Sequence, residues 1–536
     1  MTSTHSPTAV DPVGLSGAAL VLDVLQDEGV RHVFGNPGTT ELPLIQQLAS
    51  RRSLQYVLAL QEASAVAMAD GHARITGRPA FVNLHAAAGL GNGIGALTNA
   101  AAARVPLVVT AGQQDLRHLI HAPVLAGDLT GLARATVKWA HQVSTRTELG
   151  TALRQAFRMA MAPPTGPVFL SLPMNLLDEI GPAAPRITTI RYAAAAPTED
   201  LAKLLHDTPH SSIALVYGDE LARHAPAEGL ALAEKLQAPV WGTGWPATNP
   251  FPTRHPLWRG YLPTHVPGIH ETLSPYRLVI SAGAQPFPLY YPYAPGPLLH
   301  ERTTAVQITE DPSAPGRDTP IDLALHGQLQ PTLSALLDVL PACAAATHTL
   351  PDPPQEAPAP SGLGLPSAAE ALAATLPAHA IVVDEAPQAA PHIRAALDLR
   401  HANQYQWVAG GLGWAIPAAI GASLARGRGT VLCTIGDGAA LYSPQALWTA
   451  AHLELPIAFV ITNNSEYGVL KANWHQREPE PSRLLGMDLN QPAMDFVALS
   501  HSMGVPACRV ESATDLTEAL VRGYATHRPF LIDVHL

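Results

Sequence analysis

The chain has 536 residues, which is too many for one compact core, and three domains of ordinary size are expected. Its 32 Lys and Arg residues against 43 Asp and Glu residues give a formal net charge of -11, and the charges are mixed along the chain. A chain without a basic stripe is poorly suited to bind phosphate backbones, so nucleic acid is not an expected partner.

No targeting or membrane segment is expected. The N-terminal stretch MTSTHSPTAVDPVG lacks the charged and apolar regions of a signal peptide, and the apolar run 415–425 is too short to span a bilayer. Cys343, Cys433 and Cys508 are far apart in the sequence and show no metal-ligand spacing, so neither a disulfide framework nor a zinc site is predicted. A reducing, cytoplasmic location fits this pattern.

The first segment, 12–180, alternates helical patterns such as AALVLDVLQDEG with short apolar runs. These runs are HVFG, QYVLAL, AFVNLH, PLVVTAG and PVFLSLP. Alternation of this kind predicts a parallel sheet with helices on both faces.

Two further segments repeat the alternation. Residues 195–340 contain SIALVYG, APVWGTG, RLVISAG and TTAVQITED, and residues 367–536 contain AIVVDE, TVLCTIG, IAFVITN and FLIDVHL. Between them, 341–366 is rich in Pro and Ala and is expected to be a linker. The fold class is therefore α/β with three parallel-sheet domains, of which the first and third share one rhythm.

The stretch TVLCTIGDGAALYSPQALWTAAHLELPIAFVITNN places Asp437 and Asn464 directly after two predicted strands. Ligands of parallel sheets bind beyond the carboxyl ends of the strands, so these two oxygen-bearing side chains could meet there. Oxygen ligands suit Mg²⁺, and the glycines beside Asp437 would let a diphosphate approach the backbone. The alternative is an ordinary turn, because Asp-Gly and Asn-Asn are common in loops.

GDG followed by NN at this distance resembles the signature of thiamine diphosphate enzymes. The resemblance implies that Asp437, Asn464 and the backbone carbonyl of Glu466 bind Mg²⁺, which holds the diphosphate of the cofactor. Longer stretches resemble benzoylformate decarboxylase, among them GNPGTTELPL, LQEASAVAMADGHA, NLHAAAGLGNGIGALTNA, FPTRHPLWRG and AGGLGWAIPAAIG. The family fold has three doubly wound domains in the order pyrimidine-binding, middle and diphosphate-binding, which agrees with the three segments.

Further site residues follow from this resemblance. Glu62 matches the glutamate that sets the tautomer of the aminopyrimidine, although a carboxylate there could also stabilise a helix N-terminus. His85 matches the active-site histidine, and Thr39 stands where the family has a serine near the substrate carboxylate. Leu412 matches the residue that supports the bent cofactor, although it could be an ordinary core leucine. The cofactor-binding set that the resemblance implies is Asn36, Pro37, Gly38, Glu385, Gly411, Leu412, Gly436, Gly438, Ala439 and Tyr467.

A different reading comes from GLGNGIGA, in which Gly91, Gly93 and Ala96 fit the dinucleotide-binding pattern G-x-G-x-x-[GA]. An oxidoreductase would follow from it. However, no strand ending in Asp or Glu follows at the expected distance. Helix packing against the sheet explains these glycines more simply.

The sequence departs from the family at several positions. A second catalytic histidine of the middle domain aligns with Tyr291, or with Tyr290, in FPLYYPYAPG. A phenol with a pKa of about 10 transfers protons less readily at neutral pH than an imidazole. Pro387 and Gln388 replace hydroxyl-bearing residues, and Ala439 replaces a serine, so cofactor affinity could suffer.

The segment NNSEYGVLKANWHQ is predicted to line the substrate pocket by resemblance. Helical spacing places Val469 and Asn473 on one face. The family usually has a small residue at the first position and an aromatic one at the second, so a smaller or more polar substrate than benzoylformate is expected. Asn473 could instead face solvent.

The resemblance implies non-oxidative decarboxylation of a 2-oxo acid to an aldehyde and CO₂ through a thiamine diphosphate enamine. It also implies at least a dimer, usually a tetramer, because the cofactor bridges two subunits in this family. Alternatives are a carboligase of the acetolactate synthase type, a flavin oxidase and a non-catalytic binding homologue.

Overall fold

The computed structural model describes residues 14–188, 195–283, 285–290, 293–341, 363–408, 410–478 and 483–536. Tyr291, Cys343 and most of the expected linker lie outside these described residues. The chain divides into two compact units, residues 1–69 with 78–189, and residues 70–77 with 190–536. The second unit contains two of the three large sheets.

The first unit is built on a six-stranded sheet in which every neighbouring pair is parallel. Its elements are β1 (Leu15–Ser16), α1 (Gly17–Asp27), β2 (His32–Gly35), η1 (Thr39–Glu41), α2 (Leu42–Leu48), β3 (Gln55–Leu58), α3 (Glu62–Thr76), β4 (Ala80–Leu84), α4 (Ala86–Ala102), β5 (Leu107–Gln113), η2 (Leu119–His121), α5 (Leu129–Ala133), β6 (Ala140–Gln142), α6 (Arg146–Met161), β7 (Val168–Pro173), α7 (Met174–Asp178) and β8 (Ile180–Gly181). The strands follow the order β3-β2-β4-β5-β7-β6, while β1 and β8 form a separate antiparallel pair.

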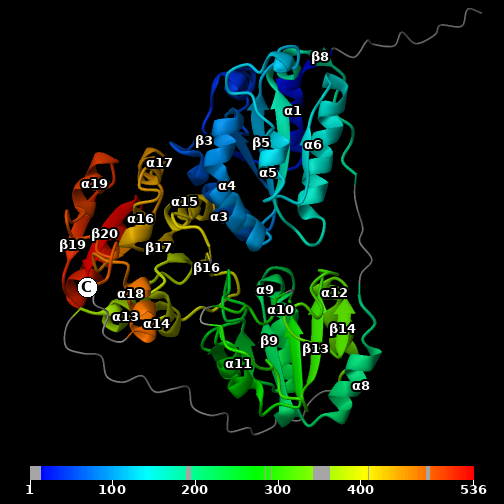
Figure 1. Ribbon diagram of the computed structural model, residues 1–536, viewed down its shortest axis with the longest axis vertical. Coiled ribbons are helices and arrows are strands. Elements are labelled where there is room, and N and C mark those ends of the chain that lie inside the picture. Colours follow the sequence, from blue (N-terminus) through cyan, green and yellow to red (C-terminus); the bar gives the residue numbers. More distant parts are fainter. Residues whose placement is uncertain are drawn as a thin grey trace, which may run out of the picture. The chain divides into compact units, whose positions relative to one another are not determined.

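The apolar runs of the strands explain why this sheet is covered on both sides. Phe81, Val108 and Val168 point into one core with helices α1 and α6, which pack against each other (Figure 1). Side chains alternate along β4, so Leu84 points to the opposite face of the sheet from Phe81, and there it lies close to Gly93 of helix α4. A strand buried on both faces needs mostly apolar residues, and these strands have them. The buried polar residues Asn83 and Thr110 on neighbouring strands bond to each other.

The middle sheet has the order β11-β10-β9-β12-β13-β14, again all parallel. Its elements are α8 (Glu199–Asp207), η3 (His210–Ser212), β9 (Ile213–Tyr217), α9 (Asp219–His224), α10 (Pro226–Leu236), β10 (Val240–Gly242), β11 (Trp258–Tyr261), α11 (Val266–Leu273), β12 (Leu278–Ala282), β13 (Thr304–Thr309), β14 (Leu323–His326) and α12 (Leu329–Val339). Alternate residues of β9 enter two cores, one shared with α10 and α12 and the other with α11.

The third sheet has the order β16-β15-β17-β18-β20-β19 and is also parallel. Its elements are α13 (Leu365–Thr375), β15 (Ile381–Glu385), α14 (Ala390–Ala396), β16 (Tyr405–Trp407), α15 (Ala415–Ala425), β17 (Val431–Gly436), α16 (Asp437–Ala440), α17 (Ala446–His452), β18 (Ile457–Asn463), α18 (Gly468–Arg477), α19 (Phe496–Ser502), β19 (Ala507–Val510), α20 (Ala513–Ala525) and β20 (Phe530–His535). Helices α13, α14 and α20 pack together, and α15 packs with α17 (Figure 1).

Strand order confirms that the first and third domains are one fold. Counted along each domain, the strands of both sheets run 2-1-3-4-6-5, whereas those of the middle sheet run 3-2-1-4-5-6. The predicted α/β class with three parallel-sheet domains is therefore correct. Besides the two-residue strands β1 and β8, the sequence analysis missed five strands of the large sheets, β6, β11, β14, β16 and β19, and each of these five is an edge strand.

One type of helix-to-strand connection recurs in all three domains. A residue with positive φ ends the helix, any residue follows, and a proline leads into the strand, as at Arg104 (φ 54°) before β5 and Glu454 (φ 50°) before β18. The amide of the next residue donates back to the helix, from Val105 to the Ala100 carbonyl at 2.8 Å. This bond is typical of a Schellman cap. Because proline forces the residue before it to be extended, the chain must leave the helix there.

Within the described residues, no helix has the length and apolarity needed to cross a membrane. Cys433 and Cys508 are both free thiols.

Gly77 offers a test of this connection, because it has the positive φ (64°) before β4 and nothing lies within 4 Å of an added Cβ. We predict that Gly77→Ala destabilises the protein by about 1 kcal/mol, because a Cβ disfavours the left-handed conformation. The same change at Gly95, inside helix α4 and equally open, should stabilise by about 0.4–1 kcal/mol. Urea unfolding midpoints measure both changes in stability. If both variants shift the midpoint in the same direction, the left-handed conformation does not explain the glycine at position 77.

Candidate functional site

The polar residues singled out in the sequence follow strands that flank the points where strand order reverses. In the first domain this point lies between β2 and β4, which pair directly, and in the third domain between β15 and β17. Loops leave such a point in opposite directions and open a crevice, which is where ligands of open α/β sheets bind. Asn36 and His85 follow the first pair of strands, while Asp437 follows β17.

Glu62 begins helix α3 and is 8 % exposed. Two amide side chains hold its carboxylate: Asn36 donates to Oε1 at 3.2 Å and Asn92 donates to Oε2 at 3.0 Å. A Cβ at Gly89 would lie 3.2 Å from Oε1, so the backbone of α4 also comes close. The carboxylate is therefore fixed in direction by one donor on each oxygen.

His85 follows β4 and is held by Glu41, a residue that the sequence analysis did not select. Nδ1 of His85 lies 2.9 Å from Oε2 of Glu41 and 3.1 Å from the hydroxyl of Thr40. Glu41 is 1 % exposed and also accepts hydrogen bonds from the backbone amides of Gly38 (2.9 Å) and Gly112 (3.0 Å). A carboxylate with only donors around it keeps the proton of the imidazole on Nδ1, which leaves Nε2 to exchange a proton.

The predicted loop 36–39 lies beside this histidine. A Cβ at Gly38 would come within 2.1 Å of the His85 ring, so only glycine allows this approach. Thr39 and Pro37 are exposed, and Thr39 begins the short helix η1. The structure thus brings Asn36, Gly38 and His85 together at one edge of the first sheet.

The dinucleotide-binding interpretation is wrong. Gly91, Gly93 and Ala96 lie inside α4, which begins at Ala86, and not at the turn between strand and helix that this motif requires. A Cβ at Gly93 would lie 3.3 Å from Leu84 and 3.4 Å from Val66. This glycine serves close packing of the helix on the sheet, as the simpler explanation predicted.

In the third domain, Asp437 is 5 % exposed and begins the short helix α16. Its Oδ1 accepts from the amide of Gly438 at 2.7 Å, whereas its Oδ2 is buried without a hydrogen-bond partner. Burial raises the pKa of this carboxyl, and the backbone amides of Gly438, Ser465 and Glu466 act against that rise. A buried oxygen without a partner costs free energy unless a cation or donor arrives.

The segment that carries Asn464 and Glu466 lies beside Asp437. Oδ1 of Asn464 accepts from the Glu466 amide at 3.2 Å, and its Nδ2 donates to Oε1 of Gln388 at 2.9 Å. Gln388, which replaces a family hydroxyl residue, therefore fixes which end of the Asn464 amide is the acceptor. Tyr467 covers Gly438, since a Cβ there would lie 2.6 Å from the ring.

This donor set fits Mg²⁺ and the diphosphate that the metal would hold. It consists of one buried carboxylate oxygen without a partner, one oriented amide oxygen and backbone carbonyls, which are hard oxygen ligands. Among the described residues there is no group of three or more His, Cys, Asp or Glu side chains that could hold a metal. A site with a single carboxylate leaves the remaining positions to phosphate and water, which is the usual arrangement for Mg²⁺.

Glu385 was predicted to bind the cofactor, and its side chain is engaged elsewhere. It is 2 % exposed and accepts from the amides of Gly413 and Ala415, each at 2.7 Å. It thereby caps helix α15 and holds the loop that contains Gly411 and Leu412. Leu412 is 41 % exposed, so it is not an ordinary core leucine in this chain.

The predicted substrate-pocket residues lie on α18. Val469 and Asn473 are half-buried, and Nδ2 of Asn473 donates to the Val469 carbonyl at 3.0 Å. Tyr290 is 53 % exposed and its ring lies 4.8 Å from that of Trp245, centre to centre. Tyr291 lies outside the described residues, so the choice between the two tyrosines stays a prediction. Of the remaining predicted residues, Gly436 is half-buried with open space where a Cβ would stand, and Ala439 is buried.

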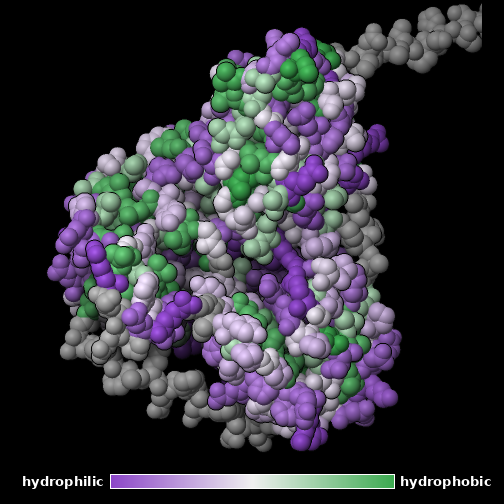
Figure 2. Space-filling view, viewed as in Figure 1, coloured by the Kyte–Doolittle hydropathy of each residue, from purple (hydrophilic) through white to green (hydrophobic). Residues whose placement is uncertain are grey.

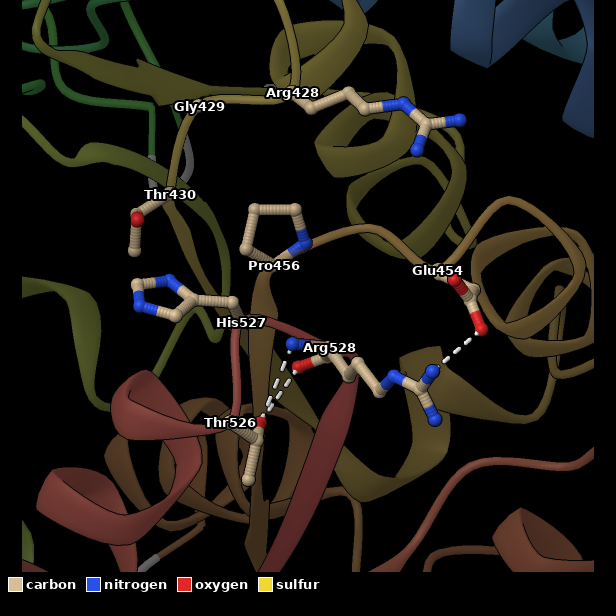
Figure 3. A pocket seen from close by; sticks show the side chains of 8 residues that line it. All are labelled: Arg428, Gly429, Thr430, Glu454, Pro456, Thr526, His527 and Arg528. Carbon is tan, nitrogen blue, oxygen red and sulfur yellow. Dashed lines mark hydrogen bonds and ion pairs between the residues drawn. The ribbon is translucent and has the colours of Figure 1, made fainter.

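A surface hollow of about 440 Å³ lies at the opposite edge of the third sheet. Its lining residues Arg428, Glu454 and His527 precede the strands β17, β18 and β20, whereas the site residues follow strand ends. In Figure 3, Arg528 turns to Glu454, which it contacts at 2.8 Å. The hollow is therefore not part of the predicted site.

The sequence analysis missed Glu41 and Asn92, and it noted Gln388 only as a departure. Glu41 had a weak local signal, since it stands three residues after Gly38 and accepts from the Gly38 amide, which is one half of a capping box. Asn92 and Gln388 had none, because their partners Glu62 and Asn464 are distant in the sequence.

Comparison with known proteins identifies three family matches along the chain. They are described as thiamine pyrophosphate enzyme, N-terminal TPP binding domain (residues 15–128), central domain (199–336) and C-terminal TPP binding domain (387–534). Each match contains most of the strands of one large sheet.

Individual relatives match nearly end to end. A benzoylformate decarboxylase of Pseudomonas aeruginosa is 38 % identical over 96 % of this chain and 97 % of its own. An acetolactate synthase large subunit of Parasynechococcus marenigrum is 27 % identical over 100 % of this chain and 91 % of its own. The solved structure of a thiamine diphosphate-dependent 4-hydroxybenzoylformate decarboxylase of Rhodococcus jostii RHA1 has a TM-score of 0.89 at 33 % identity, covering 97 % of this chain and 99 % of that one.

The cap formed by Glu385 gives a prediction about pH. Burial raises the pKa of this carboxyl from 4.5 to about 8, although backbone donors oppose the rise. Between pH 4.5 and about pH 8, Glu385 is protonated in the folded state and ionised in the unfolded state. The protonated Glu385 therefore contributes its full stability below pH 4.5, and this contribution is lost as the pH rises through about 8. The slope is on the order of 1 kcal/mol per pH unit.

Glu385→Gln keeps an uncharged group of the same shape and should remove this slope. Urea midpoints of wild type and variant, measured from about pH 5 to about pH 8, should agree at low pH, where both side chains are uncharged, and should diverge in favour of the variant as the pH rises. If the urea midpoint of the wild type instead rises relative to that of the variant as the pH increases, the ionised form of Glu385 is the one that stabilises the fold.

Proposed function

The chain belongs to the thiamine pyrophosphate enzyme family, and we propose that it is a 2-oxo acid decarboxylase, releasing CO₂ and an aldehyde without oxidation. Its cofactor is thiamine diphosphate with Mg²⁺. The observation that carries the proposal is the His85–Glu41 pair, in which Glu41 contacts Nδ1 and leaves Nε2 to exchange a proton. Decarboxylation to an aldehyde requires one proton to be delivered to the carbon that loses CO₂.

When bound, thiamine diphosphate supplies a nucleophilic carbon for the 2-oxo group and accepts the electron pair as CO₂ leaves. Asp437 Oδ2, Asn464 Oδ1 and the carbonyl of Glu466 would hold the magnesium ion, and Gln388 keeps the Asn464 amide in the orientation that metal binding needs. The glycines Gly436 and Gly438 allow the diphosphate to approach the backbone. Gly411 and Leu412, held by Glu385, would support the bent form of the cofactor.

Glu62 is proposed to hold a proton against the aminopyrimidine ring of the cofactor. Asn36 and Asn92 occupy one lone pair on each carboxylate oxygen and fix the direction of the group. A carboxyl in this position can give and take one proton without moving, which is the task of a general acid and base. Asn36 orients Glu62 through this hydrogen bond. Together with Pro37 and Gly38 it forms the loop that is proposed to contact the cofactor.

His85 is proposed to carry the second proton, through Nε2. Thr39 places a hydroxyl on the same loop, where it would contact the substrate carboxylate. Tyr291 or Tyr290 is proposed to take the place of the second family histidine. A phenol with a pKa of about 10 is mostly protonated at neutral pH, so it donates a hydrogen bond to the substrate and does not shuttle a proton.

Experiment can distinguish three alternatives. Relatives described as acetolactate synthases make a carboligase possible, in which a second carbonyl compound takes the place of the proton. A non-catalytic homologue would bind the cofactor without releasing CO₂. A flavin-dependent oxidase would show flavin absorbance after purification.

We propose a cytoplasmic homo-oligomer, a dimer of dimers with active sites between subunits. The first domain exposes apolar side chains that a second subunit would cover, and Figure 2 shows apolar patches on its surface. They are Leu42, Leu60, Ile120, Val124, Leu125 and Leu132. Light scattering after size exclusion measures the assembly, and a monomer at micromolar concentration would contradict it.

The central test is a panel of 2-oxo acids with added thiamine diphosphate and Mg²⁺. Both CO₂ and the organic product are identified. An aldehyde in equal amount to CO₂ is expected, whereas a hydroxyketone as the main product assigns the carboligase. Cofactor binding without CO₂ from any acid assigns the non-catalytic homologue.

We predict that Glu62→Gln reduces turnover at least about 100-fold, because an amide cannot exchange the proton. Cofactor binding and the oligomer should persist, since one amide partner keeps its acceptor oxygen and the other can turn its own oxygen towards the new NH2 group. Glu228→Gln on α10, far along the chain from the site motifs, is the control and should keep wild-type turnover. Near-wild-type turnover in Glu62→Gln would reject its role.

Substrate preference is predicted from α18. A valine at 469 shortens the pocket, and the Asn473 amide already donates to its own helix, so it offers an acceptor oxygen. We expect a smaller 2-oxo acid, or one with a donor group, to exceed benzoylformate by about 10- to 200-fold in kcat/KM. Val469→Ala with Asn473→Phe should shift the preference towards benzoylformate. If wild type already prefers benzoylformate and the double variant changes nothing, these two residues do not define the pocket.

A further inference from the structure

The segment that carries Asn464 and Glu466 is held by a second segment further along the chain. The Tyr467 amide donates to the Met487 carbonyl at 2.8 Å, and the Leu489 amide donates to the Ser465 carbonyl at 2.7 Å. Between these two bonds, Glu466 and Asp488 form an antiparallel bridge. The proposed metal-binding carbonyl of Glu466 therefore lies in a short two-stranded ladder.

The two residues of this bridge carry like charges. Carboxylates directly opposite each other on a ladder repel and destabilise it. Lys471, one turn into α18, resolves the conflict: its Nζ donates to Oε2 of Glu466 and to Oδ1 of Asp488, the latter at 2.6 Å. The lysine side chain is 19 % exposed, less than either carboxylate.

The ladder also contacts the predicted diphosphate loop. A Cβ at Gly438 would lie 2.6 Å from the ring of Tyr467 and 3.5 Å from Cδ1 of Leu489. A shift of the ladder would therefore move both the Glu466 carbonyl and the cover over Gly438. The same lysine belongs to α18, whose Val469 and Asn473 are the proposed substrate-pocket residues.

We propose that Lys471 is a positioning residue for the magnesium and cofactor site, acting through the Glu466–Asp488 bridge. The inference rests on the proposed function. Lys471 touches neither metal nor substrate. Its ammonium holds the bridge together, the bridge sets the Glu466 carbonyl, and near-ideal octahedral geometry is what Mg²⁺ demands of that carbonyl. Outer residues that orient metal ligands typically change metal affinity about 10- to 100-fold when they are replaced.

Electrostatics alone predicts the opposite sign. Removing the ammonium leaves two more uncompensated carboxylates next to a cation site, which would tighten Mg²⁺ binding. Weaker binding after loss of the positive charge therefore identifies a positioning role. The sign of the change separates the two explanations without reference to catalytic activity.

The experiment titrates Mg²⁺ into the full-length protein at saturating thiamine diphosphate and measures binding by calorimetry. Lys471→Met is expected to weaken the apparent Mg²⁺ affinity about 10-fold or more, and Lys471→Arg should restore it to within about 3-fold. Asp437→Ala is the reference for loss of a ligand. Lys235→Met is the matched control, because Lys235 also bonds within the second unit, to the Leu337 carbonyl at 2.5 Å, and should bind like wild type.

Lys471→Gln carries the test if the methionine variant fails to fold, because it keeps a donor for one carboxylate and should weaken binding less. Unchanged or tighter binding in Lys471→Met or Lys471→Gln overturns the positioning role. Equal weakening in Lys471→Arg and Lys471→Met does so too. Wild-type protein that binds no thiamine diphosphate rejects the proposed function instead.

Discussion

Buried carboxylates that accept backbone amides hold the loops at the carboxyl edges of the three sheets. Glu41 joins the loop after β2 to β5, Glu385 joins the end of β15 to the start of α15, and Asp219 accepts from residues 247–248 in the middle domain. Loops at a sheet edge cannot satisfy their amides within a ladder, and an unpaired buried amide is costly. The two oxygens of a carboxylate such as Glu41 accept from backbone amides of two different segments, and these hydrogen bonds fix the distance between the segments.

This constraint explains why the predicted site is built from glycine-rich loops beside acidic residues. A loop held from below by a carboxylate is free to present its remaining backbone to a ligand, and glycine removes the side chain that would block it. At Gly38 in the first domain and Gly438 in the third, the missing side chain makes room for a neighbouring ring, that of His85 and that of Tyr467 respectively. Their shared strand order makes the two edges equivalent in the fold.

The sequence was sufficient to predict the central strands of the three large sheets but only one of their six edge strands, β3. Central strands such as β5 and β18 are buried along their whole length, so they show as mainly apolar runs. The five missed strands are short edge strands, and Ala140–Gln142 and Trp258–Tyr261 are only half-buried throughout. A usable signal was overlooked: a proline stands directly before β5, β10, β18 and β20, three or four residues after the preceding helix ends.

The residues of the candidate site also differ in whether the sequence alone could identify them. Asp437, Asn464 and His85 could be chosen because each stands directly after a strand, Glu62 because it begins the helix after β3, and the resemblance supplied their roles. Residues that orient them could not be chosen, because the partner is decided by which loops approach in space. Lys471 is such a residue, because only the structure places the carboxylates of Glu466 and Asp488 beside it.

Helix α3 shows how a buried charge can be retained for specificity. Beyond Glu62 at its start, it carries Asp70 and Arg74, whose side chains are 0 % and 2 % exposed and paired at 2.5 Å. Trp414 donates to Asp70 at 2.9 Å, and Arg74 donates to the Trp407 carbonyl at 2.8 Å. A desolvated ion pair contributes little net stability, but once every donor is used it permits only one arrangement of its neighbours. Those neighbours, Trp407 and Trp414, flank the loop that carries Leu412, so the pair fixes both ends of the segment on which the bent cofactor would rest.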